Sequence, residues 1–233
     1  MNRINEIRKL EQEAHEHDYN AYELFSKDTW LASPSRTVME SLGFLRDDNP
    51  LNVLDLGSGV GRNAIPIARA LKNDETRIEC IDFLELAIDK LQENALKYDV
   101  GHKIIPILAL IDDFTIKPNS YDLIIGVSSL EHLASHKILV KKIRSIAKGL
   151  KQSGVFCLVM NCAIQEYSLV EKQYSTPQFE LNLSVDQIKT IIQNEFNEFC
   201  IKKMESSSQS YITMRHNQPI QLSAEVFNLI VVK

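Results

Sequence analysis

The residues best suited to chemistry in this chain gather in the glycine-rich stretch GSGVG at residues 57–61 and in two nearby aspartates, Asp55 and Asp82. Glycine adopts backbone angles that other residues avoid and lets main-chain groups approach a ligand closely. The first N–H groups of a helix lack intrahelical partners and attract polar or anionic ligand groups. A carboxylate can accept hydrogen bonds from both hydroxyls of a ribose. Together these residue types predict a cradle for a nucleotide-like ligand.

A strand, a turn and a helix must position this cradle. Residues 53–56 form an apolar run with the length of a buried strand. After the glycines, apolar residues recur over residues 65–71 with roughly the spacing of a helix stripe. A second strand-like run, residues 77–82, ends in Asp82. Asp82 is therefore expected at the carboxyl end of a strand, where it can bind a ribose or, alternatively, cap the helix that follows.

Two phosphate-binding motifs do not fit the glycine stretch. A dinucleotide fingerprint requires a third glycine at position 62, which is Arg62 here. A Walker loop requires a lysine followed by serine or threonine after the glycines, and that pair is missing. A nucleotide-dependent oxidoreductase on a related fold therefore stays only as an alternative hypothesis.

The sequence DLGSGVGR at residues 55–62 closely resembles the first motif of the class I S-adenosylmethionine-dependent methyltransferases, and the family pattern continues through the next strands. The resemblance implies S-adenosylmethionine as cofactor and a Rossmann-like sheet that ends in an antiparallel hairpin. A weaker similarity, WLASPSRTV at residues 30–38, is to the small single-domain methyltransferases of the tellurite-resistance type.

Strand-like and helix-like runs alternate along the chain, which predicts an α/β protein with a doubly wound, mostly parallel, seven-stranded sheet. Helices are expected over residues 2–17, 33–45, 84–97, 136–150 and 185–196, and strands over residues 53–56, 77–82, 103–110, 121–127, 154–160, 198–204 and 225–232, with an irregular loop over 161–182. We expect one methyltransferase domain, in which residues 1–46 form a helical cap or lid and residues 47–233 form the core sheet.

The resemblance implies a set of cofactor contacts. Asp82 would bind the ribose, and Asp55 would anchor the loop near the methionyl end. At the position where the family has an acid that binds the adenine amino group, this chain has Leu110. Either Asp112, two residues further on, binds the adenine instead, or backbone groups near Ile111 do so. The full predicted set is Asp55, Gly57, Ser58, Gly59, Gly61, Arg62, Asn63, Asp82, Phe83, Leu110, Ile111, Asp112 and Val127.

After the fourth expected strand, the sequence GVSSLEHL at residues 126–133 again resembles the family. His132 is a candidate general base because its ordinary pKa lies near neutrality. The alternative is a histidine that closes the pocket by packing and one hydrogen bond. Methyl transfer needs mainly a nucleophile held in line and close. We therefore expect attack by an oxygen, nitrogen, sulfur or chalcogen atom of a small molecule, with Tyr22, Trp30 and Tyr167 in an aromatic lid.

Composition excludes several other classes. The chain has 233 residues, 44% hydrophobic and 24% charged, with a formal net charge of −5 and no long run of Lys or Arg, so a nucleic-acid substrate is not expected. No apolar run is long enough to span a membrane, and the charged N-terminal residues do not resemble a secretory signal, which predicts a cytoplasmic enzyme. Four cysteines without a C-x-x-C pair predict buried reduced thiols and no metal site. The displaced acid of the third strand keeps a catalytically silent binding protein as a further alternative.

Overall fold

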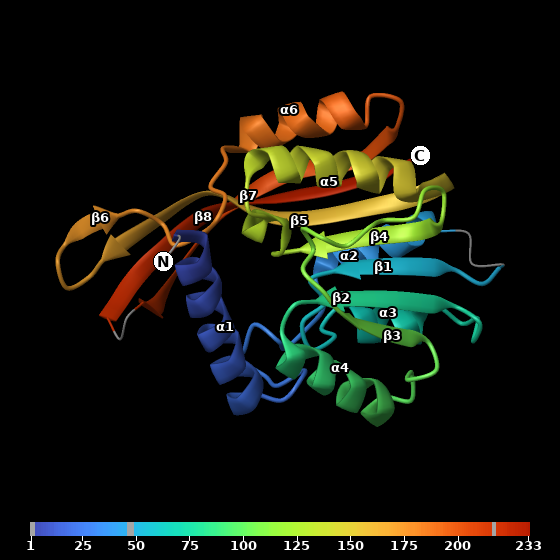
Figure 1. Cartoon of the computed structure of the whole chain (residues 1–233), viewed down its shortest axis with the longest axis horizontal. Helices are drawn as coiled ribbons and strands as arrows, with labels where there is room; N and C mark the ends of the chain where they lie inside the picture. The colour runs from blue at the N-terminus through green and yellow to red at the C-terminus, as the bar shows by residue number, and fades with distance from the viewer. Residues whose placement is uncertain (1–2, 46–48, 216–217) are drawn as a thin grey trace.

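The computed structural model describes residues 3–45, 49–215 and 218–233, and in these residues an eight-stranded sheet occupies the centre of the molecule (Figure 1). Its main strand order is β3-β2-β1-β4-β5-β8-β7, and β6 pairs with β5. The strands are β1 Asn52–Leu56, β2 Arg77–Asp82, β3 Ile104–Leu108, β4 Tyr121–Val127, β5 Leu150–Ser168, β6 Gln173–Ser175, β7 Cys200–Arg215 and β8 Gln218–Val232. The seven strands of the main order confirm the predicted sheet.

The sheet has a parallel half and an antiparallel half. β1 is parallel to both β2 and β4, and the outer pairs β2–β3 and β4–β5 are parallel too. β8 lies antiparallel between β5 and β7. In a parallel sheet of this kind, ligands bind beyond the carboxyl ends of the strands, and this edge carries both the glycine stretch and Asp82.

Helices cover both faces of the sheet. They are α1 Arg3–Ala21, α2 Arg36–Ser41, α3 Ala64–Ala70, α4 Glu85–Lys97, α5 His136–Gly149 and α6 Val185–Glu195, with short 3-10 helices η1 Leu42–Phe44 and η2 Leu130–His132. One core cluster joins the sheet to α2, α3 and α4, and the other joins it to α5 and α6. In the second cluster Phe156 of β5 stacks on Phe196 at 5.5 Å between ring centroids. Burying each ring stabilises the fold by about 1.5–3 kcal/mol. None of the helices in the described residues is long and apolar enough to cross a membrane.

Most predicted elements are confirmed within a few residues. The strands β5, β7 and β8, predicted over residues 154–160, 198–204 and 225–232, extend well beyond these bounds, and two helices differ as well. The first helix runs to Ala21, and its buried residues are Ile7 and Tyr19. The second, expected over residues 33–45, begins only at Arg36, because Ser35 still has extended backbone (ψ 129°). It changes to a 3-10 helix at Leu42.

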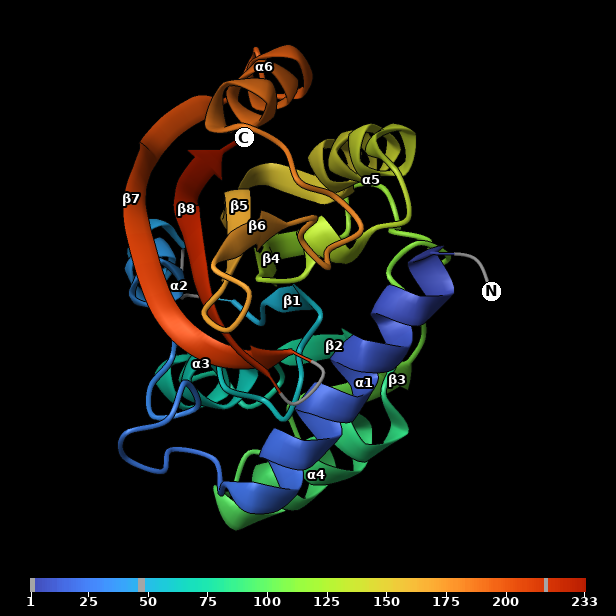
Figure 2. The same cartoon turned by 90° about the vertical axis from the view of Figure 1, so that its left-hand side faces the viewer.

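An arm of long strands replaces the irregular loop expected over residues 161–182. β5 continues to Ser168 and pairs with β8 over this length, and both extend beyond the core with β7 and β6 (Figures 1 and 2). Alternate residues from Cys162 to Ser168 are buried, including Glu166. The strand pattern was missed because polar residues occupy two of its inward positions, so the sequence does not alternate between apolar and polar.

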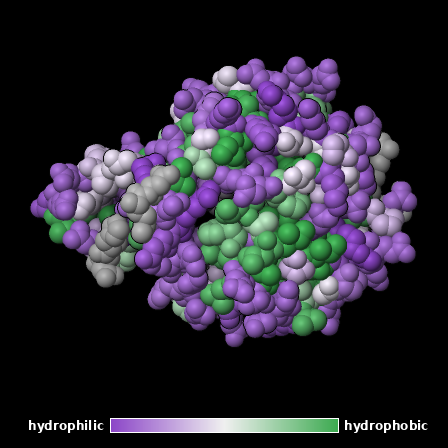
Figure 3. Space-filling model, viewed as in Figure 1, coloured by the Kyte–Doolittle hydropathy of each residue, from purple (hydrophilic) through white to green (hydrophobic). Residues whose placement is uncertain are grey.

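The connection from β3 to β4 contains no helix, so the edge strand β3 stays partly uncovered. Ile105 is 37% exposed and Leu108 is 55% exposed. Figure 3 shows an apolar patch on this face, over the region of β2 and β3 in Figure 1. Of the cysteines, Cys80, Cys157 and Cys162 are buried free thiols as predicted, whereas Cys200 at the start of β7 is exposed.

Candidate functional site

A cavity of about 1010 Å³ lies at the carboxyl ends of β1, β2 and β4, under α1 and against the arm. In Figure 2, α1 crosses in front of this edge of the sheet, and the arm curves around it. The sequence-predicted residues that line the cavity are Gly57, Ser58, Gly59, Arg62, Asn63, Asp82, Phe83, Leu110, Ile111, Asp112, Val127, His132, Tyr22 and Trp30. Asp55, buried at the end of β1, and Gly61, the last glycine of the loop, are not among the lining residues.

The glycine loop is held by β2 and takes backbone angles that favour glycine. The N–H groups of Gly57 and Ser58 both donate to the carbonyl oxygen of Ile81, at 2.8 and 2.9 Å. Gly57 and Gly59 have φ of +81° and +52°. A Cβ on Gly59 would lie 2.8 Å from the Tyr19 hydroxyl, and one on Gly57 would overlap the Ser129 side chain. Glycine is therefore required by both backbone angle and space.

Asp82 connects the glycine loop to the start of α4. Its Oδ2 accepts from the Gly59 N–H at 2.8 Å, and its Oδ1 accepts from the Leu84 N–H at 3.0 Å. The helix-capping contact is thus present, yet each carboxylate oxygen has a second lone pair and the side chain borders the cavity. Burial raises the pKa of this carboxyl group, and the backbone hydrogen bonds oppose that shift.

Beneath the loop, two polar side chains lack partners. Among the described residues, no hydrogen-bond partner reaches either carboxylate oxygen of Asp55 or the hydroxyl of Ser58, and all three atoms are buried. Burial, together with the nearby Asp82, raises the pKa of Asp55 to about 7, against the opposing field of Arg62. An unpartnered buried polar group costs about 1–3 kcal/mol. These atoms therefore fit a ligand that brings a positive charge or hydrogen-bond donors to the loop.

The residues that follow β3 are the candidates for binding an adenine ring. Leu110 and Ile111 line the cavity. Asp112 is already engaged: its Oδ2 accepts from the Arg8 guanidinium at 3.2 Å and its Oδ1 from the Ala134 N–H at 3.1 Å. This arrangement favours the alternative in which backbone groups near Ile111, rather than Asp112, make the contact.

The inner face of α1 is charged, and sequence reasoning missed it. Arg8 pairs with Asp112 and with Glu180, whose carboxylate lies 3.5 Å from the guanidinium. Glu11, one turn on, lies 3.7 Å from Arg215 at the end of β7. Burial alone raises the pKa of Glu11, but a hydrogen bond from His15 and the nearby positive charges outweigh it and lower the pKa to about 2. The signal was available: residues 8, 11, 15 and 19 recur at helix spacing.

His132 on η2 stands against Glu180 and Phe179. Its Nδ1 lies 3.0 Å from Glu180 Oε2, and its ring stacks on Phe179 at 5.4 Å between centroids. Burial lowers the pKa of His132, but the Glu180 hydrogen bond and the fields of Glu11 and Glu131 outweigh it and raise the pKa to about 9. At neutral pH the ring is therefore protonated on both nitrogens and has no lone pair for a substrate proton. This favours the pocket-closing interpretation over the general base.

Two of the three predicted lid aromatics border the cavity. Trp30 donates from Nε1 to Asp18 at 2.8 Å and stacks under the Arg62 guanidinium at 5.6 Å. Tyr22 lies beside it in the lining. Tyr167 is not in the lining: it packs against Tyr174 of β6 at 5.1 Å. The lid prediction thus does not hold for Tyr167, because its position on β5 faces away from the cavity.

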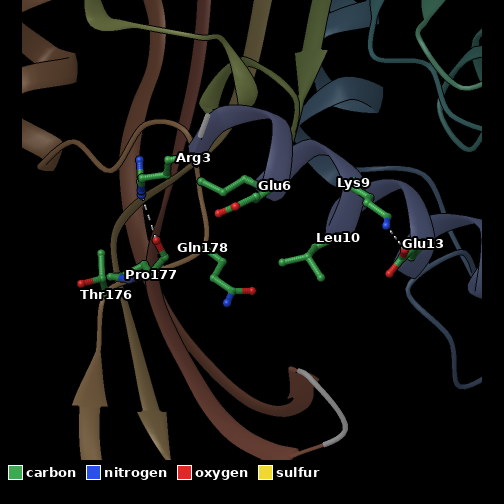
Figure 4. A pocket seen from close by; sticks show the side chains of 9 residues that line it. Arg3, Glu6, Lys9, Leu10, Glu13, Thr176, Pro177 and Gln178 are labelled. Carbon is green, nitrogen blue, oxygen red and sulfur yellow. Dashed lines mark hydrogen bonds and ion pairs between the residues drawn. The ribbon is translucent and has the colours of Figure 1, made fainter. Parts of the chain in front are cut away.

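A second, smaller hollow of about 440 Å³ lies on the opposite side of α1, against residues 176–178 (Figure 4). There Arg3 donates to the Pro177 carbonyl oxygen at 3.3 Å, and Lys9 pairs with Glu13 at 3.8 Å. None of the predicted site residues lines this hollow. The chemistry-bearing residues are therefore concentrated in the larger cavity.

Comparisons with known proteins agree with this geometry. A family model described as "Methyltransferase domain" matches residues 53–154. A mouse relative, tRNA N(3)-cytidine methyltransferase METTL2, is 28% identical over 109 residues, which is 46% of this chain and 28% of the relative's length. Among solved structures, YcgJ from Bacillus subtilis has a TM-score of 0.61 at 14% identity, covering 84% of this chain and 97% of its own. TehB from Haemophilus influenzae has a TM-score of 0.64 at 17% identity, covering 89% of this chain and 64% of its own. At these identities the structures support the fold alone.

The family match marks residues 53–154 as a methyltransferase domain, and the likeness to the solved structures supports the fold of the chain. The resemblance of the glycine motif implies S-adenosylmethionine as the cofactor. The residues present fit that group, because its amino group and positive charge match the unpartnered Asp55 and Ser58 beside a loop without side chains.

Proposed function

We propose that the protein transfers the methyl group of S-adenosylmethionine to a small-molecule acceptor bound on the arm side of the cavity. The observation that carries the proposal is the glycine loop with the unpartnered Asp55 and Ser58, joined by the Asp82 side chain at one end of a cavity that α1 covers. S-adenosylmethionine supplies an electrophilic methyl group on a sulfonium when it is bound.

In this proposal each residue has a stated task toward the cofactor. Asp82 accepts hydrogen bonds from the ribose through its remaining lone pairs. Asp55 and Ser58 receive the amino end beneath the loop. Leu110 and Ile111, together with Phe83, pack on the base. The remaining predicted contacts, including Arg62, Asn63 and Val127, border the same space.

The acceptor then needs only to be held in line with the methyl group, since correct placement supplies much of the rate. His132 serves as a positioning group, because its protonated ring cannot take a proton from the acceptor. The cover of α1 and the aromatic pair Tyr22 and Trp30 favour an acceptor small enough to be enclosed. The cytoplasmic location and the single-domain organisation stay predictions.

An RNA acceptor is the second candidate, because the mouse relative is named for methylation of tRNA cytidine. The formal net charge of −5 does not favour it, since nucleic-acid binding relies on clusters of Lys and Arg. A catalytically silent binding protein is a third. It predicts cofactor binding with no turnover of thiols, amines, phenols, oxyanions or RNA.

The test is a calorimetric titration with S-adenosylmethionine, S-adenosylhomocysteine and NADH. We expect saturable binding of the two adenosyl compounds and none of NADH. Binding of NADH alone would overturn the proposal. A mass-spectrometric search for methylated products in a metabolite extract and in bulk tRNA then separates the small-molecule acceptor from the RNA acceptor.

A further inference from the structure

The side of the cavity formed by α1, η2, β5, β7 and β8 is called the arm wall here. A chain of hydrogen bonds links a buried carboxylate to two amide side chains on this wall. Glu131 on η2 is fully buried, and its Oε1 accepts from both the backbone N–H and the side-chain Nδ2 of Asn161, at 3.1 and 2.7 Å. Because this oxygen accepts two N–H groups of one residue, the Asn161 amide has a single orientation, with its nitrogen toward Glu131.

The orientation of Asn161 in turn fixes the next amide. Asn161 Oδ1 accepts from Gln209 Nε2 at 2.8 Å. Asn161 belongs to β5 and Gln209 to β7, so the pair reaches across β8, which lies between the two strands. Both side chains line the cavity.

The pair keeps unused hydrogen-bonding capacity. Each amide nitrogen has two hydrogens and each amide oxygen two lone pairs. Within the described parts of the chain, the Gln209 oxygen has no hydrogen-bond partner, and each amide nitrogen makes its contact with a single acceptor. An acceptor and two donor hydrogens are therefore free on the wall opposite the glycine loop.

The two arginines of this wall are already paired. Arg8 contacts Asp112 and Glu180, and Arg215 contacts Glu166 at 3.4 Å and Glu11. The side chains of Glu166 and Glu180 are 2% and 1% exposed. A small anion that drew an arginine away would leave a buried carboxylate without its partner, which is strongly unfavourable. The rest of the wall includes Tyr211, Leu222 and Val226, so it favours an uncharged ligand.

We propose that Asn161 and Gln209 are the acceptor-binding pair, and that the methyl acceptor is a neutral planar molecule carrying a hydrogen-bond donor next to an acceptor, as in an amide or an amide-like heterocycle. Glu131 is a positioning residue that acts through Asn161. This inference rests on the proposed function, because it assigns the arm wall to the methyl acceptor.

The test uses three isosteric probes with protein saturated with S-adenosylhomocysteine. Benzamide carries a donor and an acceptor, acetophenone an acceptor only, and benzoate a negative charge. Titrations followed by the side-chain amide resonances of Asn161 and Gln209 are expected to show benzamide binding about fivefold or more tightly than either analogue, as one added hydrogen bond would give. Equal binding of the three probes, or tighter binding of benzoate, would overturn the inference.

Two substitutions test which side chain causes the preference for benzamide over acetophenone. Gln209→Met removes the amide while keeping the length of the side chain, so the preference for benzamide over acetophenone should be lost. Gln221→Met is the matched control: Gln221 lies on the same arm, donates to the Ser210 hydroxyl at 2.9 Å and is outside the cavity lining. It should keep the preference. A preference that survives Gln209→Met would contradict the assignment.

Glu131→Gln tests the positioning role. The amide of the new glutamine can donate as well as accept, so the Asn161 amide is no longer held in one orientation and can flip by 180°. The ratio of benzamide to acetophenone affinity should therefore fall toward one. General structural damage would weaken both probes equally and leave the ratio unchanged, an outcome that would count against this role. If S-adenosylhomocysteine itself does not bind the unmodified protein, the proposed function fails. If it binds and benzamide is not preferred, only this inference fails.

Discussion

The two walls of the cavity are built in different ways. The loop wall, residues 57–63 with Asp82, offers mainly backbone groups that are close together in sequence. The arm wall offers side chains from α1, η2, β5 and β7, such as Arg8 and Gln209, which are far apart in sequence. A ligand held by main-chain groups constrains few side chains, whereas one held by the arm wall depends on each of them. The first arrangement suits a common cofactor and the second a particular acceptor.

The walls also differ in how their polar groups are satisfied. Beneath the loop wall, Asp55 and Ser58 have no partner among the described residues. On the arm wall, Arg8 and Arg215 are each paired with two carboxylates. The loop wall thus leaves both oxygens of a carboxylate unpartnered, whereas on the arm wall the arginines are paired and only single oxygens of Glu131 and Glu180 accept no hydrogen bond from the described residues. The following four predictions test this contrast.

The largest effect is expected from a side chain added to the loop wall. Gly59→Ala places a Cβ at φ +52°, 2.8 Å from the Tyr19 hydroxyl. Strain and overpacking together should weaken S-adenosylhomocysteine binding by about 2–4 kcal/mol, measured by calorimetry. Gly43→Ala is the control, because no atom lies within 4 Å of its added Cβ and it should bind normally. Equal affinities of the two variants would remove the loop from the binding site.

Removing the carboxylate of the loop wall should have the next largest effect. Asp82→Ala loses the proposed ribose contact and the hydrogen bond to Gly59. S-adenosylhomocysteine affinity should fall by about 1.5–3 kcal/mol, the range for hydrogen bonds to a charged group. Asp113→Ala, in the turn after β3 and outside the cavity lining, should leave the affinity unchanged. If Asp82→Ala also binds normally, its role is limited to capping α4.

Breaking a buried ion pair of the arm wall should weaken the docking of α1 more than breaking an ion pair on the surface. Arg8→Met removes the guanidinium that pairs with Asp112 and with the buried Glu180, which keeps only His132. The docking of α1 should then weaken by about 1.5–3 kcal/mol, measured by hydrogen exchange of the α1 amides. Arg144→Met breaks an exposed pair with Glu195 and should leave exchange unchanged, since exposed ion pairs contribute little. Similar exchange in both variants would show that the arm wall does not hold α1.

The smallest effect is a pH dependence from His132. Because its pKa is raised to about 9 in the folded protein, the stabilisation is fully present below the ordinary value of 6.5 and is lost as the pH rises through 9. This difference corresponds to at most about 3 kcal/mol, and solvent screening of a ring that is 25% exposed lowers it to about 1–2 kcal/mol. Urea unfolding of the unmodified protein between pH 6 and pH 9.5 should show this loss. His132→Gln should show a flatter profile, and parallel profiles would place the pH dependence elsewhere.

The loop wall was readable from the sequence because its determinants are local. Glycines at fixed spacing, a strand before them and an acid at the end of the next strand are all set by near neighbours. The capping box of α6, in which Ser184 and Gln187 bond each other's backbone, was likewise partly visible from Ser184. Such features need no knowledge of distant parts of the chain.

The arm wall was mostly missed because its determinants are long-range. Arg8 meets Asp112 across 104 residues, and Gln209 meets Asn161 across 48. The inward positions of β5 include Glu166, whose burial depends on Arg215 from another strand. A polar residue that is buried only because a distant partner satisfies it looks like a surface residue in the sequence. This is also why the arm was expected to be an irregular loop.

Because β5 is one continuous strand from Leu150 to Ser168, it would set the distance between the two reactants in the proposed function. Val159 borders the cavity at the level of Val127, and Asn161 follows two residues later on the same side of the strand. Two residues of extended chain measure about 6.6–6.8 Å. In this proposal the covalent geometry of β5 sets the spacing between methyl donor and methyl acceptor, and one residue inserted after Val159 would turn Asn161 to the opposite face of the sheet.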